Sequence, residues 1–290
     1  MSFLDRIDAC NTYDLSHFVP FQIDQQTLGW IKPSFAETLK NSPSIFGVQE
    51  HAITFSAELD SADTRSAAIA EVAADWAEAG LVRKLMHEIY PVRKFWPAPD
   101  QFRLDRVLVP LFGIRAYGVH LNGYLKHNGR IMLWIGKRSG DREIEPGKLD
   151  NIVAGGQPAG LSIMGNLIKE SDEEASIPEY LTRSASSVGT IRYCMETEAG
   201  LKPDTLFCYD LELPPGFVPV NQDGEIEDFR LMPIDAALEL ISRGDAFKFN
   251  VSLVIIDFAI RHGILTPDNE PSYEAILAGL HAPPPHVHAT

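Results

Sequence analysis

The chain has 290 residues, and because a typical domain contains roughly 100 to 200 residues, this length predicts two domains or one domain with a large extension. Apolar residues make up 45% of it, but no run approaches the ~18 apolar residues of a membrane span, so we expect no membrane partner. The net charge of −15 without a local basic stripe argues against a nucleic-acid partner, whose phosphates would be repelled.

The start of the chain and its cysteines indicate a compartment. Asp5 comes early, and no apolar stretch follows a basic start, so these residues do not resemble a signal peptide. Cys10, Cys194 and Cys208 are odd in number and have neither zinc-site nor disulfide-framework spacing. Both observations fit a reducing compartment, and we predict a cytoplasmic protein.

Residues 1–110 predict a small α+β domain with a core of its own. Apolar residues recur with the period of a helix in the clearest element of this region. Pro91, Pro97 and Pro99 after it are expected to break regular structure. The expected elements are, in chain order, short strands within 18–31, a helix over 33–40, a strand over 52–59 and a helix over 66–90.

Residues 111–280 predict a second domain, in which strands are interrupted by a helix. Asn128-Gly129 between two alternating segments predicts a tight hairpin turn. The expected elements are strands over 116–126, 129–137, 188–196, 205–213 and 225–231, and helices over 234–243 and 251–262. Residues 281–290 contain three consecutive prolines between His281 and His286, which predicts a flexible tail.

A glycine turn at 155–160 precedes a short helix that carries Glu170, Glu173 and Glu174. Residues at i, i+3 and i+4 share a helix face, so three carboxylates project together and repel each other. A Mg²⁺ or Mn²⁺ ion would relieve this repulsion, because both prefer carboxylate and water oxygens. Most Glu-rich helix faces are simply solvated, however, so the three acids alone favour an exposed surface.

The spacing of the glycines and glutamates resembles the Nudix box. That motif is a glycine, five residues, a glutamate, seven residues, then Arg-Glu-apolar-any-Glu-Glu-any-Gly-apolar. With Gly155 at its first position, the three glutamates match the metal-binding positions of the family and Ile177 matches the closing apolar residue. The departures are Leu161 for the first glutamate, Lys169 for the arginine, Ser171 at an apolar position and Ser176 for the late glycine.

Segments around the motif resemble one branch of that superfamily, the long Nudix proteins similar to the Nudix portion fused to thiamine pyrophosphokinase in some fungi. These segments are residues 117–124, 133–138, 146–151, 209–214 and 221–229. The resemblance implies an α/β fold, an α/β/α sandwich with a mixed sheet, preceded here by the α+β region. It also implies hydrolysis of thiamine diphosphate, or of an oxidised or damaged derivative, to a monophosphate and phosphate.

The chemistry needs metal, a base and local positive charge. Bound metal screens the phosphate oxygens and lowers the pKa of an attacking water, and a carboxylate must accept the proton of that water. Glu225 and Glu227 lie two apart in a predicted strand, so both are expected to face one side, with an exposed hairpin end as the equal alternative. The candidate catalytic residues are Glu173, Glu174, Glu225 and Glu227, and the candidate metal ligands are Glu170, Glu173 and Glu174.

The candidate phosphate-binding residues are Lys137, Arg138, Lys148, Lys169, Gly155 and Gly156. For Lys137, Arg138 and Lys148, which precede the motif, a role in surface solubility is an equal alternative. Two other functions stay open: hydrolysis of a nucleotide sugar or dinucleotide at the same site, and ligand sensing without catalysis, to which Leu161 and Ser176 lend weight. A small-molecule diphosphate is the expected partner, and a homodimer is left open.

Overall fold

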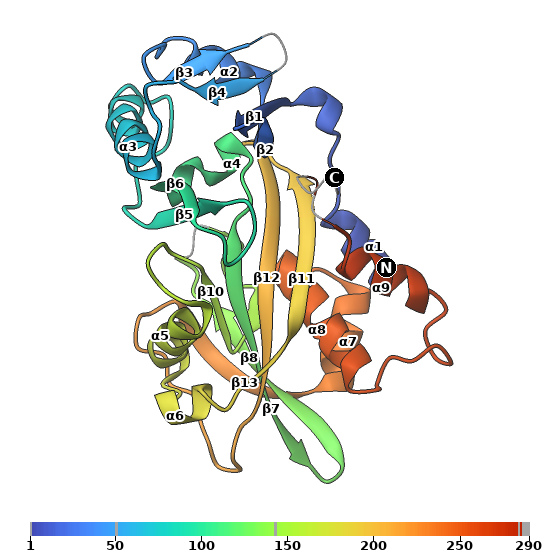
Figure 1. The fold of residues 1–290 in the computed structure, drawn as a ribbon. Helices are drawn as coiled ribbons and strands as arrows, with labels where there is room; N and C mark the ends of the chain where they lie inside the picture. The colour runs from blue at the N-terminus through green and yellow to red at the C-terminus, as the bar shows by residue number, and fades with distance from the viewer. Residues whose placement is uncertain (1, 50–51, 142–143, 284, 286–290) are drawn as a thin grey trace.

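A seven-stranded sheet forms the centre of the second region in the computed structural model, which describes residues 2–49, 52–141, 144–283 and 285 (Figure 1). Its main strands are β7 (Tyr117–His127), β8 (Arg130–Arg138), β11 (Ser186–Glu196), β12 (Leu201–Glu212) and β13 (Ile226–Pro233). They follow one another in the order β11-β12-β7-β8-β13. Because β12 is parallel to β7 and the other pairs are antiparallel, the sheet is mixed, as expected.

The sheet is forked between β7 and β8. The two strands pair only near their shared turn, where Asn128 and Gly129 have φ values of 50° and 76° and confirm the predicted hairpin. Beyond this point β9 (Leu149–Asn151) pairs with β8, and β10 (Val153–Gly156) pairs with β7. The prediction of a turn beginning at Gly155 is therefore wrong, since Gly155 and Gly156 end a strand inside the fork.

Helices cover both faces of this sheet (Figure 1). On one face, α5 (Ile163–Ala175) and α6 (Glu179–Thr182) pack their apolar residues, such as Leu167, against Val119 and Leu121 of β7. On the other face lie α7 (Ile234–Arg243), α8 (Phe249–Arg261) and α9 (Tyr273–Leu280). The arrangement confirms the α/β/α sandwich. No helix in the described part of the chain is long and apolar enough to span a membrane.

The first region has a separate aromatic core. Phe21 is fully buried and makes edge contacts with Phe102 and Phe112 at centroid distances of 5.7 and 5.3 Å. Its elements are η1 (Leu15–His17), β1 (Val19–Ile23), β2 (Gln26–Ile31), α2 (Pro33–Leu39), β3 (Phe46–Val48), β4 (Ile53–Phe55), α3 (Ala62–Glu78), β5 (Ile89–Arg93), β6 (Asp100–Asp105), η2 (Arg106–Leu108) and α4 (Val109–Phe112). The sheet order is β2-β1-β4-β3, with β5 and β6 paired separately.

The predicted helix over 66–90 is wrong at its end. α3 stops at Glu78, and Gly80 follows with φ of 69°, a left-handed conformation that glycine adopts without strain. Pro91 does not break regular structure but lies inside β5. A two-stranded ribbon leaves each strand with an outer edge, and a proline there loses no ladder hydrogen bond.

The domain boundary near residue 110 stays a prediction. The helix α1 (Phe3–Ala9) precedes this boundary but does not pack in the core of the first region. Ile7 and Cys10 belong to the same apolar core as α7, α8 and α9, so the first residues pack with the second region. This helix and α9 are absent from the elements expected from the sequence. Residues 284 and 286–290 of the predicted tail lie outside the described residues.

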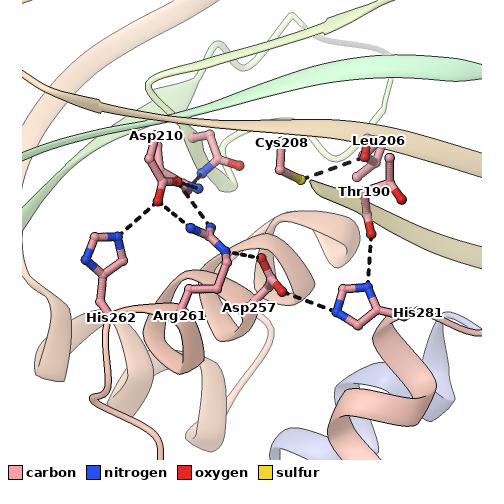
Figure 2. A network of polar contacts seen from close by, with 10 residues as sticks. Thr190, Leu206, Cys208, Asp210, Asp257, Arg261, His262 and His281 are labelled. Atoms are coloured by element: carbon pink, nitrogen blue, oxygen red, sulfur yellow. Dashed lines mark hydrogen bonds and ion pairs between the residues drawn. The ribbon is translucent and has the colours of Figure 1, made fainter. Parts of the chain in front are cut away.

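A polar network joins α8 and His281 to the sheet (Figure 2). Asp210 of β12 accepts a 3.1 Å hydrogen bond from Arg261, whose Nε also lies 2.7 Å from Asp257 Oδ2. His281 places Nε2 3.5 Å from Asp257 Oδ1 and Nδ1 3.1 Å from the Thr190 carbonyl oxygen. His281 is therefore held against the sheet, which corrects its prediction as part of a flexible tail.

Candidate active site

A cavity of about 610 Å³ lies where the forked sheet meets the β5–β6 ribbon and the start of α8. One wall consists of α5 and the end of β10, and a second consists of side chains from the ribbon and from η2. The third wall is made by β11, β12 and the first turn of α8. The volume lies within the range of small-molecule sites, roughly 300 to 1,000 Å³.

A serine lies at each end of α5, and the second one replaces the late glycine of the motif. Ser162 caps the start of the helix, since its Oγ accepts a 3.0 Å hydrogen bond from the Gly165 amide. Ser176 ends it with φ of 51°, in the left-handed region where the family motif has glycine. Its hydroxyl donates to the Val220 carbonyl oxygen at 2.7 Å, which compensates part of the strain that a side chain causes there.

Two other departures lie within α5 and in the loop before it. Ser171, at an apolar position of the motif, is fully buried. Leu161 replaces the first glutamate and is partly exposed, and its carbonyl oxygen accepts from Gln157 Nε2 at 2.9 Å. The loop before α5 is therefore held by a glutamine side chain and backbone, without a carboxylate at position 161.

Glu174 is buried beside the end of β10. Its Oε2 accepts a 2.8 Å hydrogen bond from the Ala154 amide. Burial raises the pKa of Glu174 well above its ordinary value, and the carboxylates of Glu170 and Glu225 raise it further. Burial also raises the pKa of Glu170, against the opposing effect of Lys169. Two neighbouring carboxylates with raised pKa values form a site that positive charge would stabilise.

Gly155 and Gly156 make room for side chains of the site. A Cβ atom on Gly155 would lie 2.4 Å from Cδ of Glu170, and one on Gly156 would lie 1.7 Å from the hydroxyl oxygen of Tyr90. The motif glycine thus makes room for the carboxyl group of a motif glutamate. Direct phosphate binding by these two residues stays a prediction.

Glu173 is turned toward Lys169, with Nζ 2.5 Å from Oε2, and Lys169 lies 3.4 Å from Glu170. In this side-chain arrangement, no three His, Cys, Asp or Glu residues of the described ranges converge closely enough to hold a metal ion. The donor type nevertheless fits a hard divalent cation, because Glu170, Glu173 and Glu174 offer carboxylate oxygens. Glu173 is 43% exposed, so its side chain has room to turn toward the other two.

The structure separates the two glutamates before and within β13. Glu225 lines the cavity, but Glu227 does not. The register of β13 shifts between Ile226 and Asp228, and this irregularity interrupts the alternation that would have put both side chains on one face. Glu227 instead pairs with Lys137 at 3.0 Å, and Lys137 is likewise absent from the cavity wall.

The predicted bases have different surroundings. Arg138 lines the cavity, but its guanidinium donates to Asp150 at 2.8 Å and to the Ile144 carbonyl oxygen. Lys148 lies outside the cavity wall and pairs with Asp245 at 2.7 Å. Lys169 lines the cavity. Of the predicted lysines and arginine, Lys169 is therefore the one placed beside the glutamates.

Glu88, Tyr90 and Arg106 bring the first region into the site, and none of them is predicted from the sequence. Arg106 donates to Glu88 at 2.8 Å and its guanidinium lies 5.8 Å from the centre of the Tyr90 ring. Burial raises the pKa of the Tyr90 hydroxyl. Tyr90, Pro91 and Val92 are buried in succession, so β5 lacks the alternation of buried and exposed residues that indicates a strand.

Comparisons with known proteins agree with this geometry. Residues 2–116 match the family model described as "Domain of unknown function (DUF4743)". The chain is 41% identical over 278 residues to Nudix hydrolase 20, chloroplastic, of Arabidopsis thaliana, which covers 92% of this chain and 74% of the relative. It is 40% identical over 275 residues to Nudix hydrolase 24, chloroplastic, of the same plant, with 93% and 75% covered.

Among solved structures, the NUDIX domain of Shewanella oneidensis NrtR complexed with ADP ribose overlaps 52% of this chain and 90% of that chain. The identity is 14% and the TM-score is 0.42. A similarity at this level carries no argument about the ligand of this chain.

Proposed function

Because this chain belongs to the Nudix hydrolase family, whose members cleave diphosphate bonds, we propose that it hydrolyses thiamine diphosphate, or an oxidised or damaged derivative, to the monophosphate and phosphate. The observation that carries the proposal is a pair of mutually repelling carboxylates, the buried Glu174 and the half-buried Glu170, at the wall of a cavity large enough for a ring and a diphosphate. The thiamine part of the substrate rests on the resemblance of the flanking segments to one branch of the family.

Three glutamates of α5 would hold Mg²⁺ or Mn²⁺: Glu170, Glu173 and Glu174. A divalent cation bound there would screen the charge of the diphosphate and lower the pKa of the attacking water. The Ala154 amide keeps the Glu174 carboxylate directed at the end of β10, and the absence of a side chain at Gly155 keeps Glu170 close to it. These contacts position the ligands before substrate arrives.

Glu225 is the proposed acceptor of the proton from the water. It reaches the cavity from the loop before β13, so its carboxylate is not one of the α5 ligands. Its backbone is held in place because its carbonyl oxygen accepts from the Ser139 amide at 2.9 Å and its amide donates to Asp223 at 2.8 Å. Lys169 of α5 also lines the cavity and would neutralise part of the phosphate charge.

The test incubates the purified chain with thiamine diphosphate, ADP-ribose and a dinucleoside polyphosphate, with Mg²⁺, with Mn²⁺ and with a chelator, and follows loss of each substrate by chromatography. We expect metal-dependent hydrolysis, fastest for the thiamine compound, which alone releases inorganic phosphate. Faster cleavage of ADP-ribose or the dinucleotide would reassign the substrate. Tight binding of a diphosphate without any turnover would identify a ligand sensor instead.

The compartment and the oligomeric state of the protein are also proposals, and each has its own test. Three buried, free cysteines fit a reducing, cytoplasmic environment, which cell fractionation would test. A homodimer would be detected by light scattering.

A further inference from the structure

The wall opposite α5 contains two buried oxygen acceptors without donors. Asp204 of β12 and Asn250 of α8 are 8% and 5% exposed, and both line the cavity. The Oδ1 atom of each is buried and has no hydrogen-bond partner among the described residues. A buried acceptor left without a donor destabilises the folded state, because it has lost its hydrogen bonds to water. Two such oxygens on one wall are therefore unfavourable for folding alone.

Tyr193 determines how both groups are oriented. Its hydroxyl lies 2.6 Å from Asp204 Oδ2, to which it donates its single proton. It must therefore accept the 3.3 Å hydrogen bond from Asn250 Nδ2. This order directs the amide nitrogen of Asn250 toward Tyr193 and leaves Oδ1 as its unused acceptor.

The three residues lie on regular structure. Tyr193 and Asp204 are directly opposed in the β11–β12 pair, and Asn250 is in the first turn of α8. Groups held by strands and helices are placed more precisely than groups on loops. Lys202 lies 3.7 Å from Asp204 Oδ2, so it faces the oxygen that Tyr193 already engages.

Apolar side chains beside the acceptors provide a surface for a ring. Phe249 and Leu206 line the same cavity. Tyr90 lines the cavity together with Asp204 and Glu170, and the charges of both carboxylates act on its hydroxyl group. The cavity thus has an anionic, metal-binding side and a side with aromatic, apolar and acceptor groups.

We propose that Asp204 and Asn250 form a subsite that accepts N–H donors of a heteroaromatic ring, at the end of the substrate remote from the diphosphate. This inference rests on the proposed function, because a thiamine substrate has a heteroaromatic ring at the end remote from the cleaved bond. The aminopyrimidine of thiamine carries such donors. A ring without N–H groups leaves both oxygens unpaired and binds more weakly.

The experiment measures binding by calorimetry without metal and without a diphosphate. One probe is thiamine, and the other is its thiazolium analogue with a phenyl ring in place of the aminopyrimidine. Both probes carry the same positive charge, so their difference reports the N–H donors. We expect the native chain to bind thiamine at least ~10-fold more tightly, since hydrogen bonds to a charged group contribute about 1.5–3 kcal/mol.

Asp204→Asn is expected to lose most of this preference, since any loss of attraction to the thiazolium charge affects both probes alike. Asn250→Ala tests the second oxygen and replaces Asp204→Asn if that variant fails to unfold cooperatively. Asp228→Asn, at an exposed carboxylate of β13, is the matched control and should keep the preference. Equal affinity of the native chain for both probes, or an undiminished preference in both cavity variants, would overturn the subsite.

The binding measurement does not depend on hydrolysis. Selective thiamine binding that needs Asp204, together with no hydrolysis of any diphosphate, would support the subsite and contradict the proposed function. Thiamine diphosphate hydrolysis at an unchanged rate and KM in Asp204→Asn would support the function and contradict the subsite.

Discussion

The hydroxyl group of Tyr90 lies where a side chain on Gly156 would have to be, since a Cβ atom there would be 1.7 Å from the tyrosine oxygen. Tyr90 belongs to β5 of the first region, and Gly156 ends β10 in the fork of the central sheet. The contact joins the two regions at the wall of the cavity. It lies next to the place where Gly155 admits the carboxyl group of Glu170.

Gly156→Ala should push Tyr90 out of this position. Overpacking of this kind costs about 1–3 kcal/mol, and it would move the ribbon that closes the cavity. We expect a lower midpoint of chemical denaturation and a higher KM for the diphosphate. Gly244→Ala is the control, because φ is −163° there and nothing lies within 4 Å of its Cβ.

A double variant tests whether the tyrosine is the cause. In the Tyr90→Ala background, the new methyl group of Gly156→Ala meets no ring. Gly156→Ala should therefore lower stability much less in that background than in the native chain. If the two substitutions changed the free energy of unfolding additively, the contact between Tyr90 and residue 156 would not be the cause of the lost stability.

Glu174→Gln should separate stability from activity. Burial raises the pKa of Glu174, so between the ordinary value of 4.5 and its raised value the folded state binds more protons than the unfolded state. The stability associated with this group is therefore lost as pH rises through that window. The glutamine still accepts from the Ala154 amide and carries no charge. We expect a higher Tm at pH 8 in a chelator, and hydrolysis reduced by roughly 100-fold or more.

Asp172→Asn is the matched control for this variant. It removes a carboxylate from the exposed side of the same helix, and both Tm and hydrolysis should stay close to those of the native chain. Full metal-dependent activity in Glu174→Gln would contradict the assignment of Glu174 as a ligand.

Much of the fold follows from local signals in the sequence. The Asn128-Gly129 turn, the amphipathic α7 and the apolar α8 each depend on residues near one another in the chain. The short strands β9 and β10 were not predicted, because three or four residues carry too little alternation. Their pairing depends on the divergence of β7 and β8, which is a property of the whole sheet.

The glutamates of the candidate metal site could be predicted because they lie close together in one helix. The opposite wall could not, since Tyr90, Tyr193, Asp204 and Asn250 come from four elements and each has an ordinary local context. Glu227 is a residue that was predicted in the site but lies outside the cavity. Its spacing from Glu225 suggested a shared face, and a one-residue shift of register removed it from the cavity.

Glu225→Gln and Glu227→Gln form a matched pair, since both remove one charge within three residues of chain. Glu225 lines the cavity and is the proposed base, so kcat should fall by roughly 100-fold with little change in KM. Glu227 pairs with Lys137 outside the cavity wall, and an exposed pair of this kind contributes about 0–1 kcal/mol. Its variant should keep kcat within about twofold. Equal losses in both variants would exclude Glu225 as the specific base.

His120 should make the fold sensitive to mild acid. Its Nδ1 lies 2.9 Å from Asn151 Oδ1, and Asn151 Nδ2 donates to Asn122, so Nδ1 of the neutral imidazole carries the proton. Burial lowers the pKa of His120 to about 4, with Lys248 adding to the effect. Between pH 6.5 and 4 the unfolded state therefore binds more protons than the folded state, and the stability that is present above pH 6.5 is lost as pH falls.

The measurement is the free energy of unfolding in urea at pH 7 and pH 5. His120→Gln should lose less stability over this interval than the native chain, by about 1–2 kcal/mol. Other carboxylates lose stability in both proteins, so the comparison isolates the buried imidazole. His17→Gln, at a side chain that is 68% exposed, should behave like the native chain. A pH dependence that is identical in His120→Gln and the native chain would show that the imidazole is already protonated, or solvated, in the fold.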